Sequence, residues 1–191
     1  MSKTLIKYFD FRYFIKFILI FLSLYGLNVF YIGLITEGGI YSSFIKEYLN
    51  YPSWLISLVL FGSNIITHAV GINSYISGVS LKVYYGSTVN MYWPCIGLQI
   101  MSFWVSFIVA HNNKWKGKLY WCIAGVTAIT FINILRIAFL SIAMEKRWRE
   151  NTYLSHHAMF NLAAYTIILL MIYIYYKVNS RVSDNIATSS Q

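Results

Sequence analysis

Charged residues are scarce in this chain, and acidic residues are the scarcest of them. Only 11% of the 191 residues are charged, with 15 Lys and Arg against 6 Asp and Glu. A soluble domain usually has about 25% charged residues. With 58% hydrophobic residues, the chain has too few charges to form a polar shell around a core. This composition excludes a soluble globular protein, a disordered chain and a coiled coil, and it indicates a polytopic membrane protein.

Cysteine is rare too, and the two that are present exclude a disulfide-dense secreted scaffold. The net charge of +9 does not indicate a nucleic-acid partner. In membrane proteins an excess of Lys and Arg marks the loops on the cytoplasmic side. We therefore expect no nucleic acid among the partners.

Long runs without charge locate the membrane segments, since a spanning helix needs about 20 mostly apolar residues. Five runs qualify as candidates, at residues 17–36, 54–72, 96–110, 119–144 and 158–176. The first is too long for a signal peptide and has no small-residue cleavage site after it, so we interpret it as a retained helix. The sequence thus predicts an all-α polytopic membrane protein, a helical bundle of about 4–5 spans.

The basic residues favour one orientation. If residues 54–72 lie at the outer interface or re-enter, nine basic residues lie inside and five outside, with Arg136 in the membrane. If all five segments cross with the N-terminus inside, the distribution is nearly even. The positive-inside rule favours the four-span topology, with the 114–118 loop in the cytoplasm, although residues 54–72 are long enough to cross. We expect one membrane domain at 1–176 and a disordered cytoplasmic tail at 177–191.

The segment 74–94 differs from the helical runs. Apolar and polar residues alternate between two glycines, Gly78 and Gly86, with Val79, Leu81 and Val83 against Ser80 and Lys82. This pattern predicts a short strand or hairpin, in a folded extracytoplasmic loop that ends at Pro94.

Three reactive side chains are expected at one face of the membrane. Cys95 opens the third apolar run, Arg136 lies near the far end of the fourth, and His156 and His157 open the last. Because consecutive helices run in opposite directions, these positions meet at the face opposite to the 114–118 loop. Cysteine is a nucleophile, histidine can accept and return its proton, and arginine can hold an oxyanion, so the set indicates acyl transfer.

Taken singly, each residue also has a structural interpretation. Cys95 could fill space at a helix end, Arg136 could clamp helices together, and the histidines could be interfacial. An arginine inside the membrane is nevertheless costly and is by default a functional candidate.

The motifs around these residues resemble those of exosortases and archaeosortases, which are polytopic membrane enzymes proposed to be cysteine transpeptidases. The family's Cys-Ser-Gly, Asn-x-x-Arg and helix-opening His correspond to Cys95-Ile96-Gly97, Asn133-Ile134-Leu135-Arg136 and His156-His157. The resemblance covers residues 74–176, the expected catalytic core. Ile96 replaces the family's serine, and the glycine often found four residues after the histidine is Asn161 or Phe160 here, so the choice between the histidines stays open.

The resemblance implies catalytic roles for Cys95, Arg136 and His157, with His156 and Asn133 as supporting or alternative residues. It implies no cofactor and no metal. The partners would be secreted proteins with a C-terminal sorting signal, made of a short motif, an apolar helix and a basic tail, together with an acceptor that could be a lipid or glycolipid. The location would be the bacterial cytoplasmic membrane, with the site on its extracytoplasmic face.

The main alternative is a non-enzymatic membrane scaffold or ligand-binding protein in which Arg136 is a structural clamp. A thiol oxidoreductase would need two cysteines within reach, but Cys122 lies toward the opposite face from Cys95. Haem or zinc bound by histidines is a weaker hypothesis, because His68 and His111 have no clear relation to His156 and His157.

Overall fold

The computed structural model describes residues 11–36, 41–112, 114–146 and 156–189. The chain forms two compact units, Met1–Glu145 and Lys146–Gln191, where we expected one membrane domain through residue 176. We describe each unit by itself. The model is mostly helical, which confirms the predicted all-α class.

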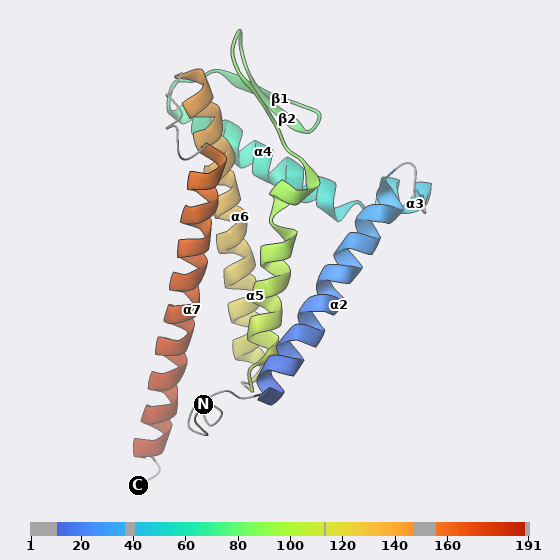
Figure 1. The fold of residues 1–191 in the computed structure, drawn as a ribbon. Coiled ribbons are helices and arrows are strands. Elements are labelled where there is room, and N and C mark those ends of the chain that lie inside the picture. The colour runs from blue at the N-terminus through green and yellow to red at the C-terminus, as the bar shows by residue number, and fades with distance from the viewer. Residues whose placement is uncertain (1–10, 37–40, 113, 147–155, 190–191) are drawn as a thin grey trace, which may run out of the picture. The chain divides into compact units, whose positions relative to one another are not determined.

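Three helices of the first unit run alongside one another: α2 (Phe11–Ile35), α5 (Leu98–Ala110) and α6 (Trp115–Glu145) (Figure 1). Aromatic rings join α2 to α5, with Tyr13 against Phe107 and Phe17 against Phe103. Farther along α2, Tyr25 accepts a hydrogen bond from Gln99. As the residue numbers of these contacts rise along α2, they fall along α5, so the two helices are antiparallel.

The short helix α3 (Ser43–Tyr48) and the longer α4 (Tyr51–Ala69) follow α2. The Asn50 side chain caps α4 by accepting a hydrogen bond from the Ser53 backbone, and Pro52 lies in the first turn, where its missing N–H costs nothing. Figure 1 shows α4 running across the end of the first unit where α2 ends and α5 begins. It packs on α6, where the Ser63 hydroxyl donates to the Ile134 carbonyl at 2.9 Å.

The expected strand segment is a three-stranded antiparallel sheet of β1 (Ser74–Ser77), β2 (Ser80–Val83) and β3 (Thr88–Asn90). Leu81 and Val83 are buried, as the alternation predicts. Val79 does not continue the pattern: it lies in the β1–β2 turn and is exposed, because the strand begins only at Ser80.

A polar cluster joins the sheet to the end of α4. The Ser74 hydroxyl is within hydrogen-bond distance of the Thr67 hydroxyl and donates to the Asn64 side chain, while the His68 ring lies 2.7 Å from the Ser74 carbonyl. The polar residues that interrupt the apolar run at 54–72 therefore satisfy the backbone and hydroxyl groups of Ser74, the first residue of β1.

The second unit consists of α7 (His156–Ser189) in its described part. This helix continues well past Tyr176, where we expected the last span to end and a disordered tail to begin. No proline or glycine follows Ala158 to interrupt it.

Within the described residues, four stretches of helix are long and apolar enough to cross a membrane: Phe11–Ile35, Ser43–Ala69, Trp115–Glu145 and Asn161–Asn179. This set differs from the expected four-span topology, which included residues 96–110 and not 54–72. At 13 residues, α5 is roughly 20 Å long, shorter than the ~30 Å hydrocarbon core. The placement of α4 across the helix ends nevertheless favours the interpretation that residues 54–72 do not cross.

The crossing of α5 and α6 depends on a glycine. Trp104 is fully buried and its indole donates to the Trp121 carbonyl at 2.9 Å, while a Cβ added to Gly125 would lie 1.8 Å from the indole nitrogen. We expect Gly125→Ala to destabilise the protein by about 1–3 kcal/mol through overpacking, and to lower its unfolding temperature in detergent.

Gly117 is the matched control, since it lies in the same helix with nothing within 4 Å of an added Cβ. Gly117→Ala should leave the unfolding temperature unchanged or raise it, because alanine is the better helix former. Equal effects of the two substitutions would contradict this account of the crossing.

Candidate functional site

Cys95 lies in a single 3₁₀ turn, η1 (Trp93–Ile96), between the sheet and α5. Pro94 at the start of this turn fixes its own backbone angle and has no N–H to leave unsatisfied. The Cys95 backbone N–H donates to the Tyr92 carbonyl at 2.9 Å, and the residue as a whole is half-buried. The nucleophile predicted from the sequence is thus held on a short turn.

Gly97 changes the direction of the chain between η1 and α5. Its φ of +82° is in the left-handed region, which glycine adopts at little cost. A Cβ at this position would also lie 2.6 Å from the side-chain nitrogen of Asn133. Both the backbone angle and the lack of space require glycine in the Cys95-Ile96-Gly97 motif.

Asn133 of α6 fastens this turn. Its side-chain amide donates to the Ile96 carbonyl at 2.7 Å, and both residues are buried. Asn133, which the resemblance gives as a supporting or alternative residue, directs its amide nitrogen to the backbone that follows Cys95. The sequence could not reveal this contact, because it joins positions 37 residues apart.

Arg136 lies one helical turn beyond Asn133 on α6 and is half-buried. Since Asn133 contacts Ile96, the α6 turn that bears Arg136 is next to the one that holds the cysteine motif. The side chains of His156 and His157 lie outside the described part of the structure, although α7 begins at His156.

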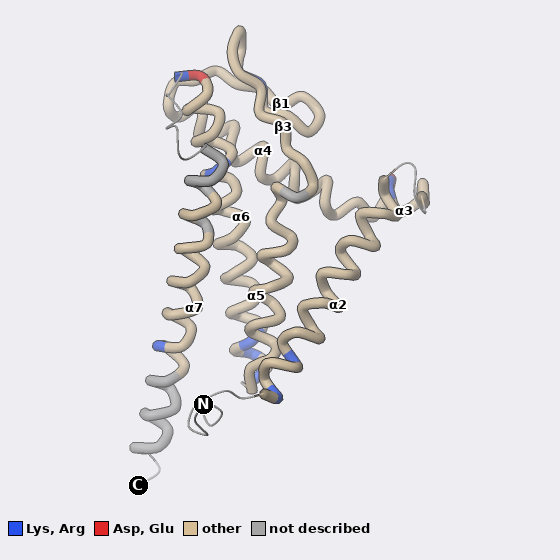
Figure 2. The backbone as a smooth tube through the Cα atoms, viewed as in Figure 1, with Lys and Arg blue, Asp and Glu red and all other residues tan. Residues whose placement is uncertain are grey.

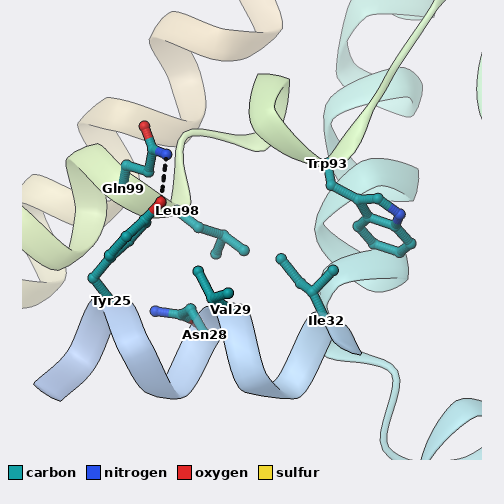
Figure 3. Close-up of a pocket in the computed structure, with 7 residues that line it drawn as sticks. All are labelled: Tyr25, Asn28, Val29, Ile32, Trp93, Leu98 and Gln99. Carbon is teal, nitrogen blue, oxygen red and sulfur yellow. Dashed lines mark hydrogen bonds between the residues drawn. The ribbon is translucent and has the colours of Figure 1, made fainter. Parts of the chain in front are cut away.

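A cavity of about 230 Å³ lies between α2 and the chain around Cys95. Figure 3 shows Val29 and Ile32 projecting from α2 toward Leu98 and Trp93, with the Tyr25–Gln99 hydrogen bond at one end of the cavity. Asn28 completes the lining. Its side chain is already occupied, since it donates to Ser102 and accepts from Tyr51. The sequence did not identify these residues, because most of them look like ordinary apolar helix positions.

The other histidines have structural surroundings. His68 contacts the backbone of Ser74, and His111 packs between the rings of Tyr13 and Phe107 at the end of α5 farthest from Cys95. Burial lowers the pKa of His111, with a smaller opposing effect from its hydrogen bond to the Phe107 carbonyl. Among the described residues, no group of three His, Cys, Asp or Glu side chains could hold a metal ion.

Cys95 and Cys122 are both free thiols. Cys122 lies eleven residues before Asn133 on α6, which is about 16 Å along the helix from the level of the cysteine turn. The two cysteines are thus separated by more than the reach of a disulfide.

The family model for transmembrane exosortases matches residues 13–174. The chain belongs to the transmembrane exosortase family. No curated protein and no solved structure matches it. The match begins within α2, so it extends the resemblance beyond the expected core of 74–176. Membership and the apolar helices make the chain a sorting-related, multi-span transmembrane protein of a family that processes secreted proteins with C-terminal sorting signals.

The contact between Asn133 and Gly97 predicts a measurable coupling. Gly97→Ala should be costly in the wild-type chain, because the new methyl group strains the backbone and meets the Asn133 amide. Asn133→Ala removes the second cost, so it should reduce the penalty of Gly97→Ala by about 1 kcal/mol or more. Thermal unfolding of the two single variants and the double variant in detergent measures the coupling.

Gly78→Ala provides the control, since Gly78 also has a positive φ, +61°, but nothing lies within 4 Å of an added Cβ. Its penalty should be the same with Asn133 or with alanine at 133. If the Gly97→Ala penalty is likewise unaffected, the Asn133 contact is not what excludes a side chain at 97.

Proposed function

We propose that this exosortase is a cysteine transpeptidase that cleaves the C-terminal sorting signal of secreted proteins and transfers the product to an acceptor. The observation that carries the proposal is the attachment of the Cys95 turn to the α6 segment bearing Arg136, in a chain of this family. A nucleophile on a fixed turn, joined to a helix segment that bears a permanent cation, suits acyl transfer, whereas a scaffold needs neither feature.

The reaction runs through a thioester. The Cys95 sulfur attacks the scissile carbonyl carbon while His157 accepts the thiol proton, and Arg136 stabilises the negative charge on the oxygen. His157 returns the proton to the leaving amine as the peptide bond breaks. The acceptor nucleophile then attacks the thioester carbonyl carbon and loses its proton to His157. The C–S bond breaks, and the released Cys95 thiolate takes that proton back from His157. A lipid or glycolipid is the acceptor that we expect for a membrane enzyme.

We place the enzyme in the bacterial cytoplasmic membrane with Cys95 on the extracytoplasmic side. Figure 2 shows Lys and Arg gathered at the end of the first unit where α2 and α6 begin. The sequence assigns Arg12, Lys16, Lys114, Lys116 and Lys118 to this end. The positive-inside rule favours placing it in the cytoplasm, and the opposite end carries the cysteine turn and the sheet.

The catalytic roles predict a graded set of losses. Cys95→Ala should abolish cleavage of a secreted reporter that carries a sorting signal, with the uncleaved reporter seen on immunoblots. Arg136→Lys should lower the cleavage rate about 100-fold or more, because a point ammonium does not reproduce the donor fork of guanidinium.

The histidines are separated in the same assay, where His157→Ala should abolish cleavage and His156→Ala only reduce it. Cys122→Ala is the control for removal of a thiol and should cleave normally. Normal cleavage by Cys95→Ala would sink the transpeptidase proposal and leave Arg136 as a structural clamp in a scaffold.

The orientation predicts which positions react from outside the cell. In a Cys95→Ala, Cys122→Ala chain, a cysteine in place of Tyr85, which is fully exposed at the β2–β3 turn, should react with a membrane-impermeant maleimide on intact cells. A cysteine in place of Lys116 should react only after the cells are lysed. The reverse pattern would place the site in the cytoplasm.

A further inference from the structure

The cavity between α2 and the chain around Cys95 is a candidate binding site. Two of its lining residues, Trp93 and Leu98, lie two residues before and three residues after Cys95. Whatever occupies the cavity therefore lies beside the chain segment that carries Cys95. The opposite wall is α2, on which Val29 is 51% exposed, so the cavity is open along its α2 side.

The cavity of about 230 Å³ is open along α2 and can take a single chain segment. A helical segment pairs its backbone N–H and C=O groups internally and has none to offer the cavity wall, so the occupant to consider is an extended chain. Such a chain is either a hydrocarbon tail or a stretch of peptide in the extended conformation.

The polar groups at one end favour the peptide. Gln99 is exposed and uses its amide nitrogen to donate to the Tyr25 hydroxyl, which leaves the Gln99 carbonyl oxygen as an acceptor and the Tyr25 hydroxyl hydrogen as a donor. A peptide backbone has N–H and C=O groups to pair with both, while a hydrocarbon tail has none. The remaining wall of Val29, Ile32, Trp93 and Leu98 suits apolar side chains.

We propose that this cavity binds, in extended form, the few residues of the substrate between its scissile bond and its apolar helix. This inference rests on the proposed function and adds the subsite that determines which sequences can follow the cleaved bond. Residues on this side of the bond leave with the helix, so the subsite positions the leaving segment while Cys95 attacks. Trp93 and Val29 are then specificity-determining residues.

Disulfide trapping in membranes tests the placement. The full chain carries Cys95→Ala and Cys122→Ala, with Val29→Cys as the only thiol. The probe is a secreted reporter with a motif, apolar helix and basic tail, in which a single cysteine moves one residue at a time from the motif into the helix. Leu27→Cys is the matched control, since Leu27 is 64% exposed on the same helix but does not line the cavity.

We expect position 29 to form at least tenfold more disulfide with the reporter than position 27 does, at alternate residues just after the motif. A period of two is the signature of an extended chain, whereas spacings of three and four would indicate a helix. Equal trapping at 27 and 29, no trapping, or helical spacing would overturn the inference. Cleavage of the same reporter by the wild-type enzyme is measured in parallel. Cleavage without trapping at 29 would sink only the subsite, whereas a reporter that is never cleaved would sink the proposed function and this inference with it.

A filling variant distinguishes peptide from lipid. Val29→Trp should raise the KM for reporter cleavage about tenfold with little change in kcat, and Leu27→Trp should leave both unchanged. If Val29→Trp instead leaves KM unaltered and lowers the fraction of product joined to lipid, the cavity holds the acceptor's hydrocarbon chain and the peptide assignment is wrong.

Discussion

The hydrogen bond from the Asn133 amide to the Ile96 carbonyl is the interaction on which the arrangement of the site depends. It joins α6 to the backbone just after Cys95, and it is buried, where a neutral hydrogen bond is not weakened by water. Gly97 makes the approach possible, since a Cβ there would lie only 2.6 Å from the amide nitrogen. The cysteine turn and the start of α5 are therefore joined to the Arg136 segment of α6 at this contact.

A turn of this kind is an unusual structure in a membrane protein, because lipid offers no hydrogen-bond partners for irregular backbone. Here the turn is covered by protein. The α4 helix runs across the end of the first unit where α5 begins (Figure 1). Its Ser63 hydroxyl donates a hydrogen bond to the carbonyl of Ile134, the residue that follows Asn133. The sheet, whose residues Leu81 and Val89 are buried, also contacts α4 and α6. The polar residues of α4 thus have a structural purpose: they allow a helix to lie where the chain around Cys95 needs cover.

Local pattern in the sequence predicted the elements, but not the contacts between distant ones. The apolar runs gave the helices, and the alternation of Leu81 and Val83 gave the strand β2, because both signals depend on neighbouring residues. The motifs gave the family. The partner of Asn133, the direction of α4 and the cavity beside Cys95 depend on packing between segments far apart in the chain. The extent of α7 past Tyr176 differs from the expectation for another reason: the polar composition of residues 177–191 favours a disordered tail, whereas no proline or glycine interrupts the helix there.

The order of environments along the chain matches the order of parts in a sorting signal. Ahead of Cys95 the chain forms a sheet with exposed polar residues such as Thr88 and Asn90, and after it comes the apolar helix α5. A sorting signal likewise passes from a polar motif to an apolar helix. Under the proposed function, the hydrophobic effect would favour a substrate whose polar part lies beside the sheet and whose apolar part lies beside α2 and α5. The change in polarity would then fall at the cysteine turn, so the hydrophobic effect would help to set the register of the substrate.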